Sequence, residues 1–133
     1  MSTRLDEAQR YVDAAKQILN LSQWDIKVKD YPSAEDAYAD IEPHDHLWHA
    51  KLRLSEDFFK EPAEEQRKII AHELLHLHYA GVERLVSSTE SVIGAAAYDL
   101  YSKVWEIEIE RAADALSGPV GGLLPMPKFK RTK

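Results

Sequence analysis

The chain has 133 residues, a length that favours one domain with a buried core. With 44% hydrophobic and 30% charged residues it has the composition of a globular protein, and no apolar run reaches the roughly 20 residues that a transmembrane helix needs. The net charge of −6 disfavours a nucleic-acid binder, and the absence of cysteine excludes disulfides, thiolate metal ligands and cysteine nucleophiles. The N-terminus has no secretion signal, so we expect a cytoplasmic protein.

The first half of the chain predicts a helix followed by a small sheet. Apolar residues recur every three or four positions over residues 4–21, as in an amphipathic helix. Residues 24–29 and 47–54 alternate apolar and polar side chains, as strands do, and residues 37–41 form a weaker strand that pairs with 47–54 in a hairpin. His44, His46 and His49 could form a metal cluster, but histidines in a turn and on an exposed strand face are more often solvated, which we favour.

Residues 62–84 predict a second helix, which carries the motif H-E-x-x-H at residues 72–76. Positions four apart lie on one helix face, so His72 and His76 present two imidazoles with Glu73 beside them. Two imidazoles and a third protein group can hold a catalytic zinc ion that activates water, and an adjacent carboxylate can take the proton of that water. Because histidines in this apolar run need partners, we favour a zinc site over hydrogen-bonded core histidines.

A long helix is predicted over residues 89–116, ended by Gly118-Pro119. Tyr98, Tyr101, Trp105 and Ile109 recur at helical spacing and are interpreted as core rather than as a cofactor site. We expect a single domain over residues 1–118 and an irregular basic tail over 119–133, whose charges are solvated rather than bound to nucleic acid.

The third zinc ligand does not follow from the motif itself. In the metzincin pattern a histidine would stand at position 82, where this chain has valine. His78 points roughly 160° around the helix from His76, so it cannot readily serve. Glu110 on the second long helix is the better candidate, because two alanines follow it and allow close approach of the helices, while Glu106 and Glu108 stay open as alternatives.

The motif H-E-x-x-H followed by E-x-x-A-D at residues 110–114 resembles the glutamate-type zincins (gluzincins), particularly the small ImmA/IrrE-like peptidases of phages and mobile elements. This resemblance, over about residues 24–117, implies that His72, His76 and Glu110 bind Zn²⁺, that Glu73 is the general base, and that Asp114 holds a ligand histidine by its other ring nitrogen. It implies a minimal zincin-like α+β fold: an N-terminal helix, a three-stranded sheet, the motif helix and a long C-terminal helix.

We therefore expect a zinc metallopeptidase that hydrolyses a protein or peptide substrate, with residues 47–54 bordering the cleft as a strand to which the substrate adds. By chemistry alone, His78, Tyr79, Tyr98 and Tyr101 are open candidates for stabilising the oxyanion. The alternative is a non-catalytic, metal-stabilised binding or regulatory protein on the same scaffold, of phage origin. Glu73 favours the enzyme, because a purely structural site needs no base.

Overall fold

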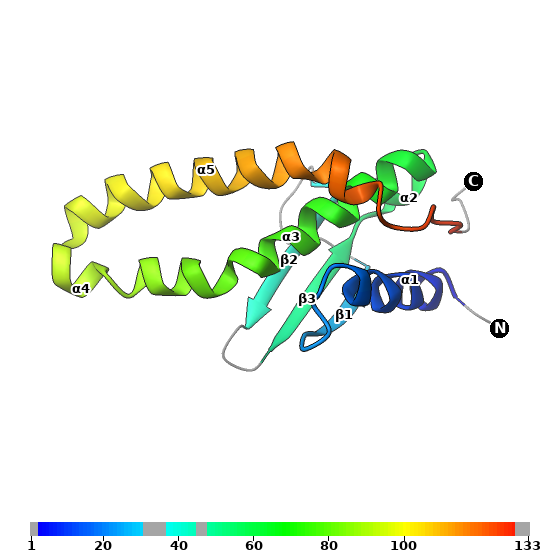
Figure 1. Cartoon of the computed structure of the whole chain (residues 1–133), viewed down its shortest axis with the longest axis horizontal. Helices are drawn as coiled ribbons and strands as arrows, with labels where there is room; N and C mark the ends of the chain where they lie inside the picture. Colours follow the sequence, from blue (N-terminus) through cyan, green and yellow to red (C-terminus); the bar gives the residue numbers. More distant parts are fainter. Residues whose placement is uncertain (1–2, 31–36, 45–47, 130–133) are drawn as a thin grey trace.

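A computed structural model describes residues 3–30, 37–44 and 48–129, and it has a mixed α+β architecture (Figure 1). Its elements are α1 (Arg4–Ile18), β1 (Asp25–Lys29), β2 (Ala39–His44), β3 (His49–Leu54), α2 (Glu56–Lys60), α3 (Ala63–Ser87), α4 (Glu90–Ile93) and α5 (Ala95–Gly121). The predicted α+β class and the small three-stranded sheet are confirmed for this part of the chain.

The sheet has the strand order β1-β3-β2. The central strand, β3, pairs in parallel with β1 and antiparallel with β2, so the predicted pairing of the second and third strands is confirmed. The expectation that residues 47–54 border the cleft as an open edge is wrong, because both edges of β3 are paired (residue 47 itself lies outside the described residues). Of the three strands, β2 makes the main contact with α3.

One face of the sheet forms the core and the other faces solvent. Ile26, Leu52 and Leu54 are fully buried, whereas the neighbouring residues Lys27 and Lys51 are exposed, as the period of two requires. Helix α1 packs against β1. The amide of Gln9 donates to the carbonyl of Ile26 at 2.7 Å and accepts from the backbone N–H of Val28 at 2.8 Å, which satisfies part of the β1 edge.

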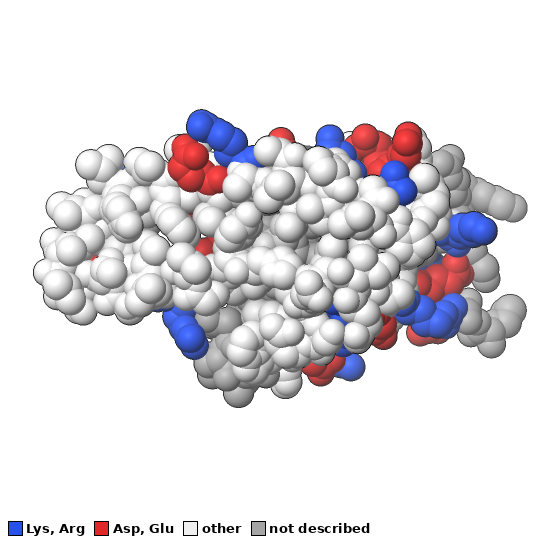
Figure 2. Space-filling model, viewed as in Figure 1, with Lys and Arg blue, Asp and Glu red and all other residues white. Residues whose placement is uncertain are grey.

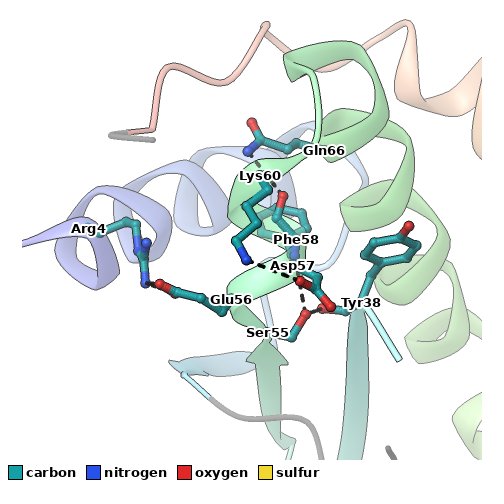
Figure 3. Close-up of polar contacts among 8 residues, drawn as sticks. All are labelled: Arg4, Tyr38, Ser55, Glu56, Asp57, Phe58, Lys60 and Gln66. Atoms are coloured by element: carbon teal, nitrogen blue, oxygen red, sulfur yellow. Dashed lines mark hydrogen bonds and ion pairs between the residues drawn. The ribbon is translucent and has the colours of Figure 1, made fainter. Parts of the chain in front are cut away.

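A short helix, α2, connects the sheet to the motif helix (Figure 3). Ser55 caps it by accepting from the N–H of Phe58 at 3.2 Å, and its hydroxyl donates to the carbonyl of Tyr38 at 2.9 Å. Phe58 and Phe59 are buried with their ring centroids 5.0 Å apart. This connection fixes where α3 begins relative to the first residues of β2.

The last long helix differs from its prediction at both ends. Gly94, with φ of 91°, separates the short α4 from α5, so a single helix over 89–116 is wrong. The predicted stop at Gly118-Pro119 is also wrong, since α5 continues to Gly121 with Pro119 inside it. Close packing of the end of α5 against α3 explains the extension. A Cβ on Gly121 would lie 3.6 Å from the Cβ of Ala71, and Ser117 is buried. This packing offsets the cost of a proline inside the helix.

The described part of the predicted tail is irregular after Gly121 but belongs to the core. Leu124 is buried, and the hydroxyl of Tyr11 donates to the carbonyl of Pro125 at 2.7 Å. The ring of Phe129 lies 5.5 Å from that of Tyr11 and 5.9 Å from that of Phe59. The basic residues after Phe129 lie outside the described residues.

Helices α3 and α5 run antiparallel and project beyond the sheet as a two-helix arm, which we define as residues 81–107 (Figure 1). On the face drawn in Figure 2 the far end of the arm carries few charged side chains.

The prediction that the aromatic residues of α5 are core is wrong for Tyr101, which is 51% exposed, because the arm has no sheet to pack against. Ile109, at the base of the arm, is buried. Among the described helices, none combines the length and apolarity that crossing a membrane requires.

Candidate metal centre

The structure brings His72, His76 and Glu110 together at the base of the arm. The Nε2 atom of His76 lies 2.8 Å from one carboxylate oxygen of Glu110, and the Nε2 atom of His72 lies 3.2 Å from the other. The two imidazole centroids are 5.2 Å apart. His72 and His76 lie one turn apart on α3, whereas Glu110 lies on α5, 38 positions from His72 in the chain. The three side chains therefore meet at one point.

Burial of the two helices sets this geometry. Ile70, Leu74 and Leu77 are buried in the core and fix the rotation of α3, so that both histidines face α5. On α5, Ala113 is fully buried, and its small side chain allows the two backbones to approach closely one turn after Glu110. The residues on either side of the ligand candidates thus position them.

The other acidic candidates on α5 do not belong to this three-residue group. Asp114 has a carboxylate oxygen 3.6 Å from Nδ1 of His72, the ring nitrogen that does not face Glu110. Glu108 instead pairs with Arg111 at 3.1 Å, and Glu106 lines a cavity farther along the arm. Glu106 and Glu108 are not members of the three-residue group.

The donor set fits a zinc ion. Four ligand atoms at 2.0–2.2 Å from a tetrahedral zinc stand about 3.3–3.6 Å apart, and the three donor atoms here all lie within 4.8 Å of one another. Two imidazole nitrogens and one carboxylate leave a fourth position open, as in catalytic sites. Burial lowers the pKa of His76, although Glu110 raises it in part and His72 lowers it further; a lowered pKa favours the neutral imidazole that a metal ligand must be.

Glu73 lines the same cavity as the three candidate ligands. Burial raises its pKa to about 8 in the metal-free protein, and the carboxylates of Glu110 and Asp40 add to the shift. A carboxyl group with this pKa holds a proton at neutral pH and releases it when a positive charge arrives nearby. It can therefore both accept and donate a proton near pH 7.

The raised pKa of Glu73 predicts a pH-dependent stability of the metal-free protein. The unfolded carboxyl titrates near 4.5 and the folded one at about 8, so the stability present below pH 4.5 is lost as the pH rises toward 8. We expect Glu73→Gln to raise the free energy of unfolding by on the order of 2 kcal/mol at about pH 8.5 and to leave it unchanged at about pH 4.

Urea unfolding of the chelator-treated protein at both pH values measures this difference. Glu108→Gln, which removes an exposed carboxyl on the neighbouring helix, is the matched control and should show no such pH dependence. An equal effect of Glu73→Gln at both pH values would mean that Glu73 does not titrate in this range.

Three recesses surround the candidate ligands. The central one, of about 250 Å³, is lined by all three ligands, Glu73 and the β2 residues Asp40, Ile41 and Pro43. A second, also of about 250 Å³, shares His72 and Glu73 with it and reaches Tyr38. A third, of about 590 Å³, shares His76 and Glu110 with it and extends between α3 and α5. Together they form a cleft along β2 with the three ligands at its middle.

The structure separates the four candidates for oxyanion stabilisation. Of these, Tyr98 lines the large recess that reaches His76 and Glu110. His78 lies in a different cavity with Trp24 and Trp48, and neither Tyr79 nor Tyr101 is among the residues that line the three recesses.

Sequence reasoning missed three residues that line the cleft: Tyr38, Asp40 and Glu83. Tyr38 lies just before β2 and Asp40 is the second residue of β2, and no motif marks either of them. Glu83 could have been found, because it stands seven residues after His76, about two helical turns farther along the same face of α3. Burial raises its pKa, and the carboxylates of Glu106 and Glu110 add to the effect.

The histidines near the β2–β3 turn do not form a group with metal-binding geometry among the described residues. His44 lies 3.8 Å from Glu42, and His49 is exposed opposite it in the sheet. His46 lies outside the described residues. In residues 3–30, 37–44 and 48–129, His72, His76 and Glu110 are the group whose atoms could hold an ion.

Compared with known proteins, the chain matches no family model, and no curated protein or solved structure is significantly similar to it.

Proposed function

We propose that this chain is a zinc-dependent metallopeptidase that hydrolyses peptide bonds, with His72, His76 and Glu110 as the zinc ligands. The observation that carries the proposal is the meeting of two imidazole Nε2 atoms and one carboxylate, with Glu73 lining the same cavity. A metal site that serves only the fold needs ligands but no base with a pKa near neutrality. The chemistry of the group therefore favours hydrolysis over structural metal binding.

Bound zinc would polarise the carbonyl group that is attacked and make water acidic enough to react near neutral pH. The pKa of Glu73, about 8 in the metal-free protein, would fall when zinc binds, so that Glu73 could take a proton from the attacking water and later give it to the leaving amine nitrogen. Asp114, whose carboxylate lies 3.6 Å from Nδ1 of His72, would steady this ring from its other side and keep Nε2 directed at the ion. The β2 edge beside the ligands would hold the main chain of an extended substrate.

The experiment is a joint measurement of zinc content and proteolysis on the purified full chain. We expect about one zinc per chain, cleavage of an unfolded fluorescent casein, loss of cleavage after treatment with a chelator, and recovery when zinc is returned. A protein that binds no zinc contradicts the ligand set. A protein that binds one zinc and cleaves neither casein nor a peptide library supports the non-catalytic binding protein instead.

A further inference from the structure

The largest recess of the cleft lies to one side of the candidate ligands. It has a volume of about 590 Å³ and is bounded by His76 and Glu110 at one end and by the arm along its length. Pockets of about 300–1,000 Å³ hold small ligands, so this recess has room for one long side chain and its hydration water. Its position beside the ligands places it where the side chain of a substrate residue next to the cleaved bond would lie.

The walls of this recess combine three kinds of side chain. Val86 and Ile109 are buried and give it an apolar floor. Trp105 contributes an indole ring, and Glu83 and Glu106 contribute carboxylates, which form no ion pair with any lysine or arginine of the described chain. An apolar wall, an aromatic ring and unneutralised carboxylates suit the methylene stem and the charged end of one class of side chain.

We propose that this recess is a specificity pocket for a lysine or arginine side chain of the substrate, a step that rests on the proposed peptidase function. The aliphatic stem packs along Ile109 and Trp105, and the cationic end is bound by Glu83 and Glu106. These two carboxylates lie close enough to repel one another, and a bound cation removes this repulsion.

The charges of the other lining residues agree with a cationic occupant. Arg84 is the cation among the lining residues, and it also lines the separate cavity that contains His78. Against it stand the carboxylates of Glu83, Glu106 and Glu110. The recess on the opposite side of the ligands also has three carboxyl groups and one cation, Lys68, so charge does not separate the two sides. The larger volume of this recess and the indole ring of Trp105 do, and they assign the long basic side chain to one side of the cleaved bond.

The test measures peptide binding apart from cleavage. Fluorescein-labelled nonapeptides of glycine, alanine and serine carry a single lysine, norleucine or glutamate at each internal position in turn. They are titrated by fluorescence anisotropy against zinc-treated Glu73→Gln protein, and wild type is assayed for cleavage of the same peptides. We expect one position at which the lysine peptide binds about tenfold more tightly than the norleucine peptide, and at which glutamate weakens binding.

The double variant Glu83→Gln/Glu106→Gln should lose this tenfold difference while it keeps the zinc content of wild type. Glu108→Gln, on the same helix but outside the recess, should retain the difference. Glu106→Lys should turn the preference toward glutamate. A lysine preference that survives the double variant, an equal affinity for lysine and norleucine, or no peptide binding overturns the pocket. Lysine-selective binding with no cleavage by wild type supports the pocket and counts against the peptidase function.

Discussion

Replacement of Glu73 by glutamine is expected to leave the zinc content at the wild-type value and to slow peptide cleavage by about 10²–10⁴-fold. Glutamine has nearly the same shape but cannot take a proton from water, so the loss falls on the chemical step rather than on metal or peptide binding. Measured with casein or a peptide that wild type cleaves, kcat should fall and KM should change little. Zinc content by elemental analysis separates this effect from loss of the ion.

Two other results would change the interpretation of Glu73. If Glu73→Gln lost its zinc, the residue would act as a ligand or support one. If it kept both zinc and full activity, another group would be the base. The same variant is also expected to be more stable than wild type without metal, because the buried carboxyl costs stability above pH 4.5. If Glu73 serves function and costs stability, Glu73→Gln should be both inactive and more stable than wild type.

Replacement of Glu110 by glutamine is expected to weaken zinc binding by at least about a hundredfold, since the only carboxylate of the group is lost. The neutral amide leaves the two imidazoles without the charge that faces both of their Nε2 atoms. Titration with a competing zinc chelator at pH 7 measures the change. Cleavage should fall with zinc occupancy and recover partly at high zinc concentrations.

The matched controls for Glu110 lie on the same helix. Glu106→Gln and Glu108→Gln remove carboxylates one turn and two residues earlier, neither of which belongs to the group around the histidines, so both should keep wild-type zinc affinity. Asp114→Asn should weaken zinc binding by about 10–100-fold, less than loss of a direct ligand, because Asp114 acts through Nδ1 of His72. A variant of Glu106 that loses zinc while Glu110→Gln retains it would assign the third ligand to Glu106.

The sequence predicts the parts of the centre that depend on local geometry. His72 and His76 share a helix face because of their spacing, and Glu110 could be preferred over Glu106 and Glu108 because small residues follow it. The α+β class and the approximate strands also follow from periodicity. The zinc itself and the roles of these residues stay predictions.

The features that depend on contacts between distant segments could not be predicted. Nothing local indicates that β1 pairs with β3 and so makes β3 the central strand and β2 the edge strand beside the ligands. Helix α5 continues through Pro119 because Gly121 packs against Ala71, a contact 50 residues apart in the chain. Tyr101 has the spacing of a core residue but lies on the arm, where the sheet does not reach it.

The candidate metal ligands lie just outside the arm, at its base. The metal centre and the arm can therefore change in sequence separately. The ligands and Glu73 lie where α3 and α5 pack beside the sheet, whereas many of the other walls of the large recess, among them Glu83, Trp105 and Glu106, belong to the arm. Substitutions, or whole turns added around Gly94, can therefore reshape the recess without moving the ligands. Under the proposed function, one metal centre could thus be combined with many different arms, each selecting its own substrate.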